Sequence, residues 1–295
     1  MLCMKRALQL VAVFVFGVAT VELAGADGEA IDLILVAGQS NSVGFDAPAD
    51  EMPVNERDKQ VMFWWKVGDP PPDKHDSTSG SKWTHLQAQP LGNPIKPRRD
   101  RQYGNFGQPQ GGFGPEVGMA RALMDAGQKE LAIVKASFSG TGVRKDWNPR
   151  STAADGACYR ALISETGKAV AVAKEKGIRL RLRALVWLQG ESDSGPADVG
   201  HYEDAFVEMM QSARKDLNAP NMTILLGVNT RFLEKRNRPM HRIVEAQKNT
   251  AKRIGNASYV DTSKCSIANQ VHFDAKGTME MGRMFAEQLR RIEER

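Results

Sequence analysis

Five short apolar runs, separated by helical patterns, constrain the fold of this chain most strongly. The runs are continuously apolar and rich in β-branched residues, as in strands buried on both faces; they span 31–37, 131–136, 182–188, 223–228 and 258–261. Helical patterns lie between or after them, at 114–125, 157–176, 202–217, 239–254 and 275–292. Strands alternating with helices predict an α/β fold, a three-layer α/β/α sandwich around a five-stranded parallel sheet.

The first 26 residues have the pattern of an export signal. Lys5 and Arg6 give a basic start, the apolar run at 8–18 is short for a membrane span, and Ala24-Gly25-Ala26 offers small residues for cleavage. We therefore expect a signal peptide at 1–26 and one domain at 27–295. The mature protein would be secreted or periplasmic, without stable membrane association. The alternative is a membrane anchor that stays uncut.

The charge and the cysteine content of the chain limit which partners and metals it is expected to bind. The 295 residues carry a formal net charge of +5, without a basic stripe interleaved with aromatic residues, so we expect no nucleic-acid partner. No Cys/His cluster has the spacing of a metal site, so we expect no metal. Cys158 and Cys265 are the two cysteines of the mature chain. Export would permit a disulfide between them, and two free thiols are the equal alternative.

Residues 46–112 interrupt the alternation of strands and helices. This segment is rich in Pro, Gly, Asp and Lys and lacks clear periodicity, which predicts a long loop insertion. Loops of this length are usually functional or disordered. Its aromatic residues, among them Trp83, suit stacking on sugar rings, although a small satellite core beneath the loop is the alternative.

The residues that follow the predicted strands are the candidate site. Ligands of such sheets bind at the carboxyl ends of the strands. Ser40 follows the first strand within Gly38-Gln39-Ser40-Asn41. A serine at such a turn can expose its hydroxyl at the rim of the sheet and direct its N–H at a developing oxyanion. The alternative is a helix N-cap.

Three more motifs are expected at the same rim. Ser139-Gly140-Thr141 follows the second strand, Gln189-Gly190-Glu191 follows the third, and His272 precedes the last helix. Each motif alone is weak evidence for an active site. The occurrence of all of them at the boundaries of strands and helices is much more specific. Asn41, Arg231 and His241 are further candidates for contact with a substrate.

These motifs resemble those of the SGNH-hydrolase superfamily. The chain is most similar to its carbohydrate acetylesterases, namely carbohydrate esterase family six and the sialate O-acetylesterase-like domain. The resemblance runs from Ile31 to Leu289, and the matching segments are Gly38-Gln39-Ser40-Asn41, Gly112-Phe113-Gly114-Pro115-Glu116, 135–147, Gln189-Gly190-Glu191-Ser192-Asp193, and Val271-His272-Phe273 with Gly277.

The resemblance implies a flavodoxin-like fold and a serine esterase that removes acetyl groups from a carbohydrate without a cofactor. An acetylxylan esterase and a sialate O-acetylesterase are both compatible with it. Carried over to this chain, it implies Ser40 as nucleophile and His272 as general base. The N–H groups of Ser40 and Gly140 and the side chain of Gln189 would form the oxyanion hole.

The chain departs from the superfamily at one position. Where the superfamily usually has Asp, three residues before the histidine, this sequence has Asn269. An amide can accept a hydrogen bond from imidazole but supplies no negative charge for imidazolium. We favour Glu191 as the carboxylate that orients His272 instead. The alternatives are a catalytically inactive glycan-binding protein and an SGNH lipase or thioesterase, although the polar, Pro-rich insertion argues against an acyl-chain channel.

Overall fold

The computed structural model describes residues 29–69, 76–92, 106–153, 155–236 and 239–295. The predicted signal peptide at 1–26 lies outside these residues. Among the helices that the structure describes, none is both long and apolar enough to cross a membrane.

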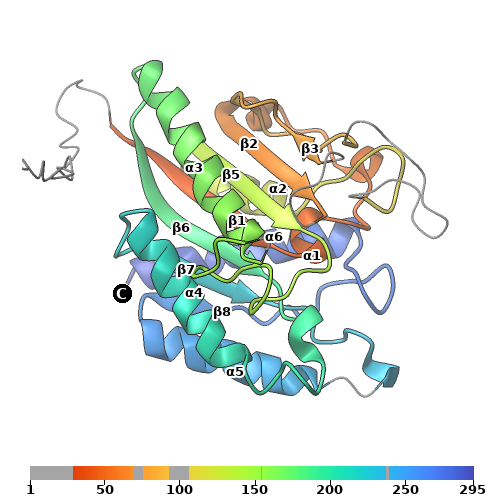
Figure 1. Ribbon diagram of the computed structural model, residues 1–295. Coiled ribbons are helices and arrows are strands. Elements are labelled where there is room, and N and C mark those ends of the chain that lie inside the picture. The colour runs from red at the N-terminus through yellow and green to blue at the C-terminus, as the bar shows by residue number, and fades with distance from the viewer. Residues whose placement is uncertain (1–28, 70–75, 93–105, 154, 237–238) are drawn as a thin grey trace, which may run out of the picture.

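The described chain forms one eight-stranded sheet with the order β3-β2-β5-β1-β6-β7-β8, in which β4 also pairs with β2 (Figure 1). The mutually parallel strands are β1 (Ile31–Gly38), β2 (Val61–Gly68), β5 (Leu131–Phe138), β6 (Leu180–Leu188), β7 (Thr223–Gly227) and β8 (Ala257–Tyr259). The short strands β3 (Ser77–Thr78) and β4 (Thr84–His85) run antiparallel to β2.

The expectation of a parallel α/β sheet is confirmed, but the expected strand number is wrong. The five predicted runs correspond to β1, β5, β6, β7 and β8, and β2 is a further parallel strand inside the segment expected to be a loop. Its core, Phe63-Trp64-Trp65, is buried: Phe63 and Trp65 pack on one face of the sheet and Trp64 on the other. The described parts of the segment 46–112 therefore extend the sheet.

Helices cover both faces of the sheet (Figure 1). One face carries α3 (Ala157–Glu175), α4 (Tyr202–Asp216) and α5 (Met240–Ile254), and the other carries α2 (Pro115–Asp125) and α6 (Ala275–Glu293). Along β1, Leu33 and Leu35 point to the first core and Ile34 and Val36 to the second. This alternation on a strand buried on both faces explains its continuous apolar sequence.

Short helical turns complete the fold. The one-turn helix α1 (Ser40–Val43) follows β1, and single turns of 3₁₀-helix span Ala49–Glu51, Glu56–Gln60, Ser192–Ser194 and Glu234–Arg236. Among the described residues both cysteines are free and buried. Cys158 belongs to the core under α3 and Cys265 to the core under α6, so the sheet separates the two thiols and a disulfide between them does not form.

A buried ion pair fixes the end of α1 against the sheet. Lys135 on β5 lies 2.9 Å from Glu116 at the start of α2, and both side chains are fully buried. The ammonium group also donates to the carbonyl of Val43 at 3.0 Å and to Gln89 Oε1 at 2.7 Å. Burial lowers the pKa of Lys135, and the Glu116 carboxylate opposes this effect. One cation thus ties α1, α2, β5 and the insertion together.

We predict that Glu116→Gln destabilises the fold by about 3–5 kcal/mol, because it leaves the Lys135 charge buried without its counter-ion. Asp125→Asn is the matched control, since it removes one carboxylate from the exposed pair with Arg57 and should cost less than about 1 kcal/mol. Urea unfolding of both variants measures the difference. Equal losses in the two variants would contradict the role given to the buried pair.

Candidate functional site

Ser40 lies where β1 turns into α1, at the carboxyl end of the sheet. Gly38 adopts φ +139°, and a Cβ at this position would lie 2.1 Å from the carbonyl oxygen of Leu188 on β6. Only glycine fits this close approach. The next residue, Gln39, donates its N–H to the same carbonyl at 3.0 Å, so the backbone that presents Ser40 is fixed against β6.

The loop that carries His272 is fastened to α1 by the side chain of Asn41. Asn41 Nδ2 donates to the carbonyl of Val271 at 3.1 Å, and Asn41 Oδ1 accepts from the N–H of Phe273 at 3.1 Å. The residues before and after His272 are therefore both bound to the neighbour of Ser40. This clamp brings the predicted nucleophile and base to one place, and it gives Asn41 a structural role rather than the expected contact with substrate.

Glu191 anchors the same clamp from beneath. Its Oε1 accepts from Asn41 Nδ2 at 2.8 Å and from the N–H of Asn229 at 3.0 Å. Asn229 Nδ2 in turn donates to the carbonyl of Val271 at 3.1 Å. Burial raises the pKa of Glu191, although these donors and the nearby His272 favour its ionised form.

The imidazole of His272 is bonded to a different carboxylate. His272 Nδ1 lies 2.7 Å from Asp46 Oδ2, and the two side chains are 13% and 18% exposed. Asn269 Nδ2 donates to the same Asp46 oxygen at 2.8 Å. The ring of Phe45 packs on the imidazole with a centroid distance of 4.7 Å. The expected contact between Glu191 and His272 is therefore wrong: Glu191 points into the clamp, and Asp46 takes its place.

The surroundings of Asp46 favour its charged form. Burial opposes ionisation, but the hydrogen bond from His272, the charge of the imidazolium and the hydrogen bond from Asn269 outweigh burial and place the pKa of Asp46 below its ordinary value. An ionised acceptor that receives two N–H groups is a suitable partner for an imidazolium.

The loop after β5 presents Gly140 to open space. Gly140 is exposed with φ +70°, and a Cβ added at this position would meet no other atom within 4 Å. The following residues are held firmly: Thr141 Oγ1 donates to the carbonyl of Phe138 at 2.8 Å, and Val143 N–H donates to Asp193 at 3.1 Å. The oxyanion-hole role of Gly140 stays a prediction, which an exposed glycine on a hydrogen-bonded loop allows.

Gln189 does not have the environment expected of an oxyanion-hole donor. Its side chain is fully buried, and Nε2 donates to the carbonyl of Thr141 at 2.9 Å and to the carboxylate of Asp193. Both amide hydrogens are thus already bonded inside the protein. Gln189 braces the Gly140 loop from below, which corrects the expectation that it is the third donor.

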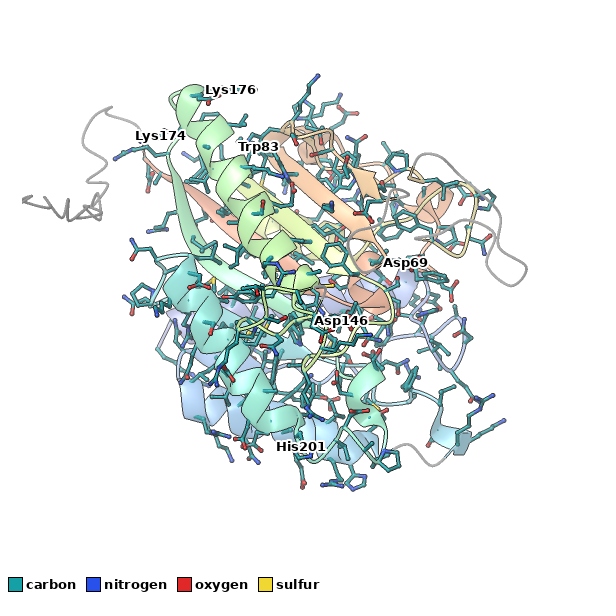
Figure 2. The ribbon with its side chains drawn as sticks, viewed as in Figure 1. Asp69, Trp83, Asp146, Lys174, Lys176 and His201 are labelled. Atoms are coloured by element: carbon teal, nitrogen blue, oxygen red, sulfur yellow. The ribbon has the colours of Figure 1, made fainter. Side chains whose placement is uncertain are left out.

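Three other candidates lie elsewhere or serve another contact. Trp83 donates its indole N–H to the carbonyl of Ala169 on α3 at 2.9 Å. Figure 2 shows Trp83 toward the end of α3 that carries Lys174 and Lys176, whereas Asp69 and Asp146 lie toward the other end. The Trp83 side chain packs on the core as the satellite-core alternative describes, and its expected contact with a sugar stays a prediction.

Arg231 and His241 differ in their surroundings. Arg231 follows β7 and donates a guanidinium N–H to the carbonyl of Cys265, so it connects two loops at the rim. His241 is exposed in the first turn of α5. Arg231 is thus held in place near the His272 loop, while the role of His241 stays a prediction.

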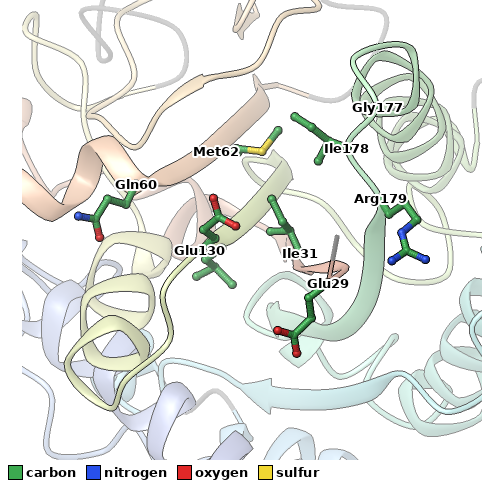
Figure 3. Close-up of a pocket in the computed structure, with 9 residues that line it drawn as sticks. Glu29, Ile31, Gln60, Met62, Glu130, Gly177, Ile178 and Arg179 are labelled. Carbon is green, nitrogen blue, oxygen red and sulfur yellow. The ribbon is translucent and has the colours of Figure 1, made fainter. Parts of the chain in front are cut away.

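A distinct hollow lies at the opposite end of the sheet (Figure 3). It is lined by residues at the amino ends of β1, β2, β5 and β6, including Glu29, Met62 and Arg179. It contains none of the predicted site residues, and ligands of parallel sheets bind at the other end. In the described part of the chain, no group of three or more His, Cys, Asp or Glu residues is arranged to hold a metal ion.

Sequence reasoning missed Asp46 and Asn229. Asp46 begins the segment interpreted as a loop, but it stands only six residues after Ser40. Because α1 is a single turn, a carboxylate at this spacing stays near the nucleophile, which was the available signal. Asn229 is the second residue after β7, at the rim where the parallel strands end.

The Asn41 clamp gives a prediction about stability. Asn41→Ala should lower the unfolding free energy by about 2–4 kcal/mol, since it removes three hydrogen bonds, to Glu191, to the Val271 carbonyl and from the buried Phe273 N–H. Asn249→Ala removes an exposed amide that donates to Glu203 and should change stability by less than about 0.5 kcal/mol. Urea unfolding compares the two. An Asn41→Ala protein as stable as the control would refute the clamp.

The buried carboxylate of Asp193 gives a prediction about how stability depends on pH. Burial raises the pKa of Asp193 to about 6, and the bonds from Gln189 and Val143 only partly offset this. An unfolded aspartate titrates near ~3.9. The folded state thus binds the proton of Asp193 more tightly than the unfolded state does. The resulting contribution to the unfolding free energy is fully present below about pH 4 and is lost as the pH rises through about 6.

Asp193→Asn cannot titrate and serves as the reference. We predict that the unfolding free energy of the wild type, relative to this variant, decreases between about pH 4 and about pH 7. Chemical unfolding across this range measures the difference. A difference that is constant or increases with pH would show that Asp193 is not protonated in the folded state.

Comparison with known proteins places this chain in a family. Residues 30–291 match the protein family described as "Carbohydrate esterase, sialic acid-specific acetylesterase". No curated protein sequence matches the chain. Among solved structures, a protein from Arabidopsis thaliana is 16% identical with a TM-score of 0.64, and the match covers 89% of this chain and 99% of that one.

Two further structures share the fold. NanS is 17% identical with a TM-score of 0.58, over 90% of this chain and 98% of that one. A carbohydrate acetylesterase from Xanthomonas citri is 15% identical with a TM-score of 0.58, over 88% of this chain and 56% of that one. At these identities the structures establish the fold alone, an α/β fold with a mostly parallel sheet flanked by helices. The match over residues 30–291 establishes more: the chain belongs to the sialic acid-specific acetylesterase family of carbohydrate esterases, and hence to the carboxylic ester hydrolases.

Proposed function

We propose that this protein hydrolyses O-acetyl esters on a carbohydrate outside the cytoplasm, with Ser40 as nucleophile and His272 as general base. The observation that carries the proposal is the Asn41 clamp, which binds both neighbours of His272 to the residue that follows Ser40. Membership of the carbohydrate esterase family supports the reaction class. The export-type pattern of residues 1–26 supports the location.

The reaction needs only side chains and backbone of this chain. Nε2 of His272 takes the proton from Ser40 as Oγ attacks the acetyl carbonyl, and the N–H groups of Ser40 and Gly140 stabilise the oxyanion. The sugar oxygen leaves with the proton from His272. Water, deprotonated by His272, then attacks the acetyl group on Ser40, and acetate leaves as Ser40 recovers its proton.

The glycan-binding alternative rested on the loss of the usual aspartate at position 269. It loses this support because His272 has a carboxylate partner in Asp46. The lipase or thioesterase alternative needs room for an acyl chain. Against it, the segment 46–112 contributes β2 and buried aromatic side chains to the core. A short acyl group esterified to a hydroxyl of a carbohydrate is therefore the proposed substrate.

We predict that Ser40→Ala reduces acetate release by at least about four orders of magnitude without loss of stability, since the reaction loses its nucleophile. The assay is acetate release from acetylated xylan and from O-acetylated sialic acid, together with nitrophenyl esters of increasing chain length. Ser42→Ala is the control. It removes a hydroxyl two residues away that bonds to Ser137, and it should preserve turnover per folded molecule.

The outcomes separate the candidate functions. Near wild-type turnover in Ser40→Ala would eliminate Ser40 as the nucleophile. A folded wild-type protein that binds these glycans but releases no acetate would favour the glycan-binding alternative. A preference for long acyl chains over acetyl would favour a lipase or thioesterase.

A further inference from the structure

We propose that the carboxylate which orients His272 has moved to the nucleophile segment, so that Asp46 is the positioning residue of the base and Asn269 positions Asp46. This inference rests on the proposed function and deepens it. The acid would come from six residues after Ser40, rather than from three residues before His272.

The oxygen and the nitrogen of the Asn269 side-chain amide have different hydrogen-bond partners. Its Oδ1 accepts from the N–H groups of Val271 at 2.8 Å and His272 at 3.0 Å. This oxygen is bonded to the backbone of its own turn and does not serve the imidazole. The other end of the amide, Nδ2, donates to Asp46. Asn269 thus shapes the His272 turn with one end and holds the carboxylate with the other.

Two N–H groups converge on one oxygen of Asp46. Oδ2 receives Asn269 Nδ2 at 2.8 Å and His272 Nδ1 at 2.7 Å. A carboxylate in this position requires the proton of the neutral imidazole to be on Nδ1. Nε2 is then left without a hydrogen, which is the form that can take a proton from Ser40. Asp46 therefore fixes the tautomer, the orientation and the charge partner of His272 together.

The insertion also limits the position of Asp46. The N–H of Gly107 donates to the carbonyl of Phe45 at 2.7 Å, and a Cβ on Gly107 would lie 2.3 Å from Asp46 Oδ1. The ring of Phe45 covers the imidazole. Asp46 is thus enclosed between the turn at 269–272 and the end of the insertion, which restricts the carboxylate to a small range of positions.

Glu191 is another carboxylate close to His272, and its contacts assign it a different role. Its Oε1 is bonded to Asn41 and Asn229, and its buried Oε2 has no hydrogen-bond partner in the described residues. Glu191 thus holds the loop that carries the base and leaves the ring nitrogen to Asp46.

The first test removes the charge of Asp46 and keeps its shape. Asp46→Asn should lower kcat on an acetyl ester by about 10²–10⁴-fold with little change in KM, the scale of losing an orienting carboxylate. The acid limb of the kcat/KM profile should move to lower pH, because the imidazolium loses its carboxylate partner. Asp50→Asn removes an exposed carboxylate of the same segment and should leave both quantities unchanged. Wild-type kcat and an unmoved pH profile in Asp46→Asn would overturn the proposal.

The second test moves the orienting carboxylate from position 46 to position 269, where the superfamily usually has it. Asp46→Ala/Asn269→Asp restores a carboxylate from the segment before His272, next to the space vacated by the Asp46 side chain. It should be at least about tenfold faster than Asp46→Ala alone, because a triad requires an orienting carboxylate and not a particular chain position. A double variant no faster than Asp46→Ala would overturn the exchange between the two loops.

A third measurement does not depend on turnover. The ¹⁵N chemical shifts of the His272 ring in the neutral enzyme should report a proton on Nδ1 in the wild type, and a loss of this preference in Asp46→Asn. The same tautomer mixture in both proteins would overturn the role of Asp46. Since Ser40→Ala tests the esterase reaction separately, failure of the proposed function and failure of this inference give different results.

Discussion

The site depends on one buried amide. Asn41 uses both hydrogens of its Nδ2, toward Glu191 and the Val271 carbonyl, and its Oδ1 accepts from Phe273. The loop around His272 comes more than 220 residues after Ser40, and this side chain fixes the relation between them. A buried polar group satisfied at every position is both stabilising and directional, because any displacement leaves a donor or acceptor without a partner.

The residues that hold the Asn41 side chain and its surroundings in place come from different elements of the fold. Glu191 enters after β6 and Asn229 after β7, and both act on the residues around His272 through Asn41 or the Val271 carbonyl. On the other side, Lys135 holds the carbonyl of Val43 at the end of α1. Glu191 and Asn229 reach the same rim because the parallel strands β6 and β7 end there. The buried carboxylates Glu191 and Glu116 both fix the positions of loops.

The parts of the structure that are local in sequence could be predicted, and those that depend on packing could not. The strands β1, β5 and β6 each contain a run of mainly apolar residues, and Ser40, Gly140 and His272 occupy motifs that a single segment defines. β2 was missed because Pro and Gly surround it and its Trp and Phe side chains were interpreted as loop aromatics. Glu191 and Asp46 are both carboxylates at the rim. Which of them faces His272 depends on whether Asn41 and Asn229 engage Glu191, and that pairing joins distant segments.

Asn269 is then a consequence of Asp46 rather than a sign of decay. With a carboxylate already 2.7 Å from His272 Nδ1, an aspartate at position 269 would direct a second negative charge at Asp46 Oδ2 from 2.8 Å. Like charges this close disfavour each other's ionisation, and one of them would hold a proton and leave the imidazolium with a weaker partner. An amide has the same shape, keeps the two backbone bonds of the turn, and offers a donor where the second charge would repel. The asparagine at 269 and the aspartate at 46 therefore form one arrangement, in which each residue suits the site only because of the other.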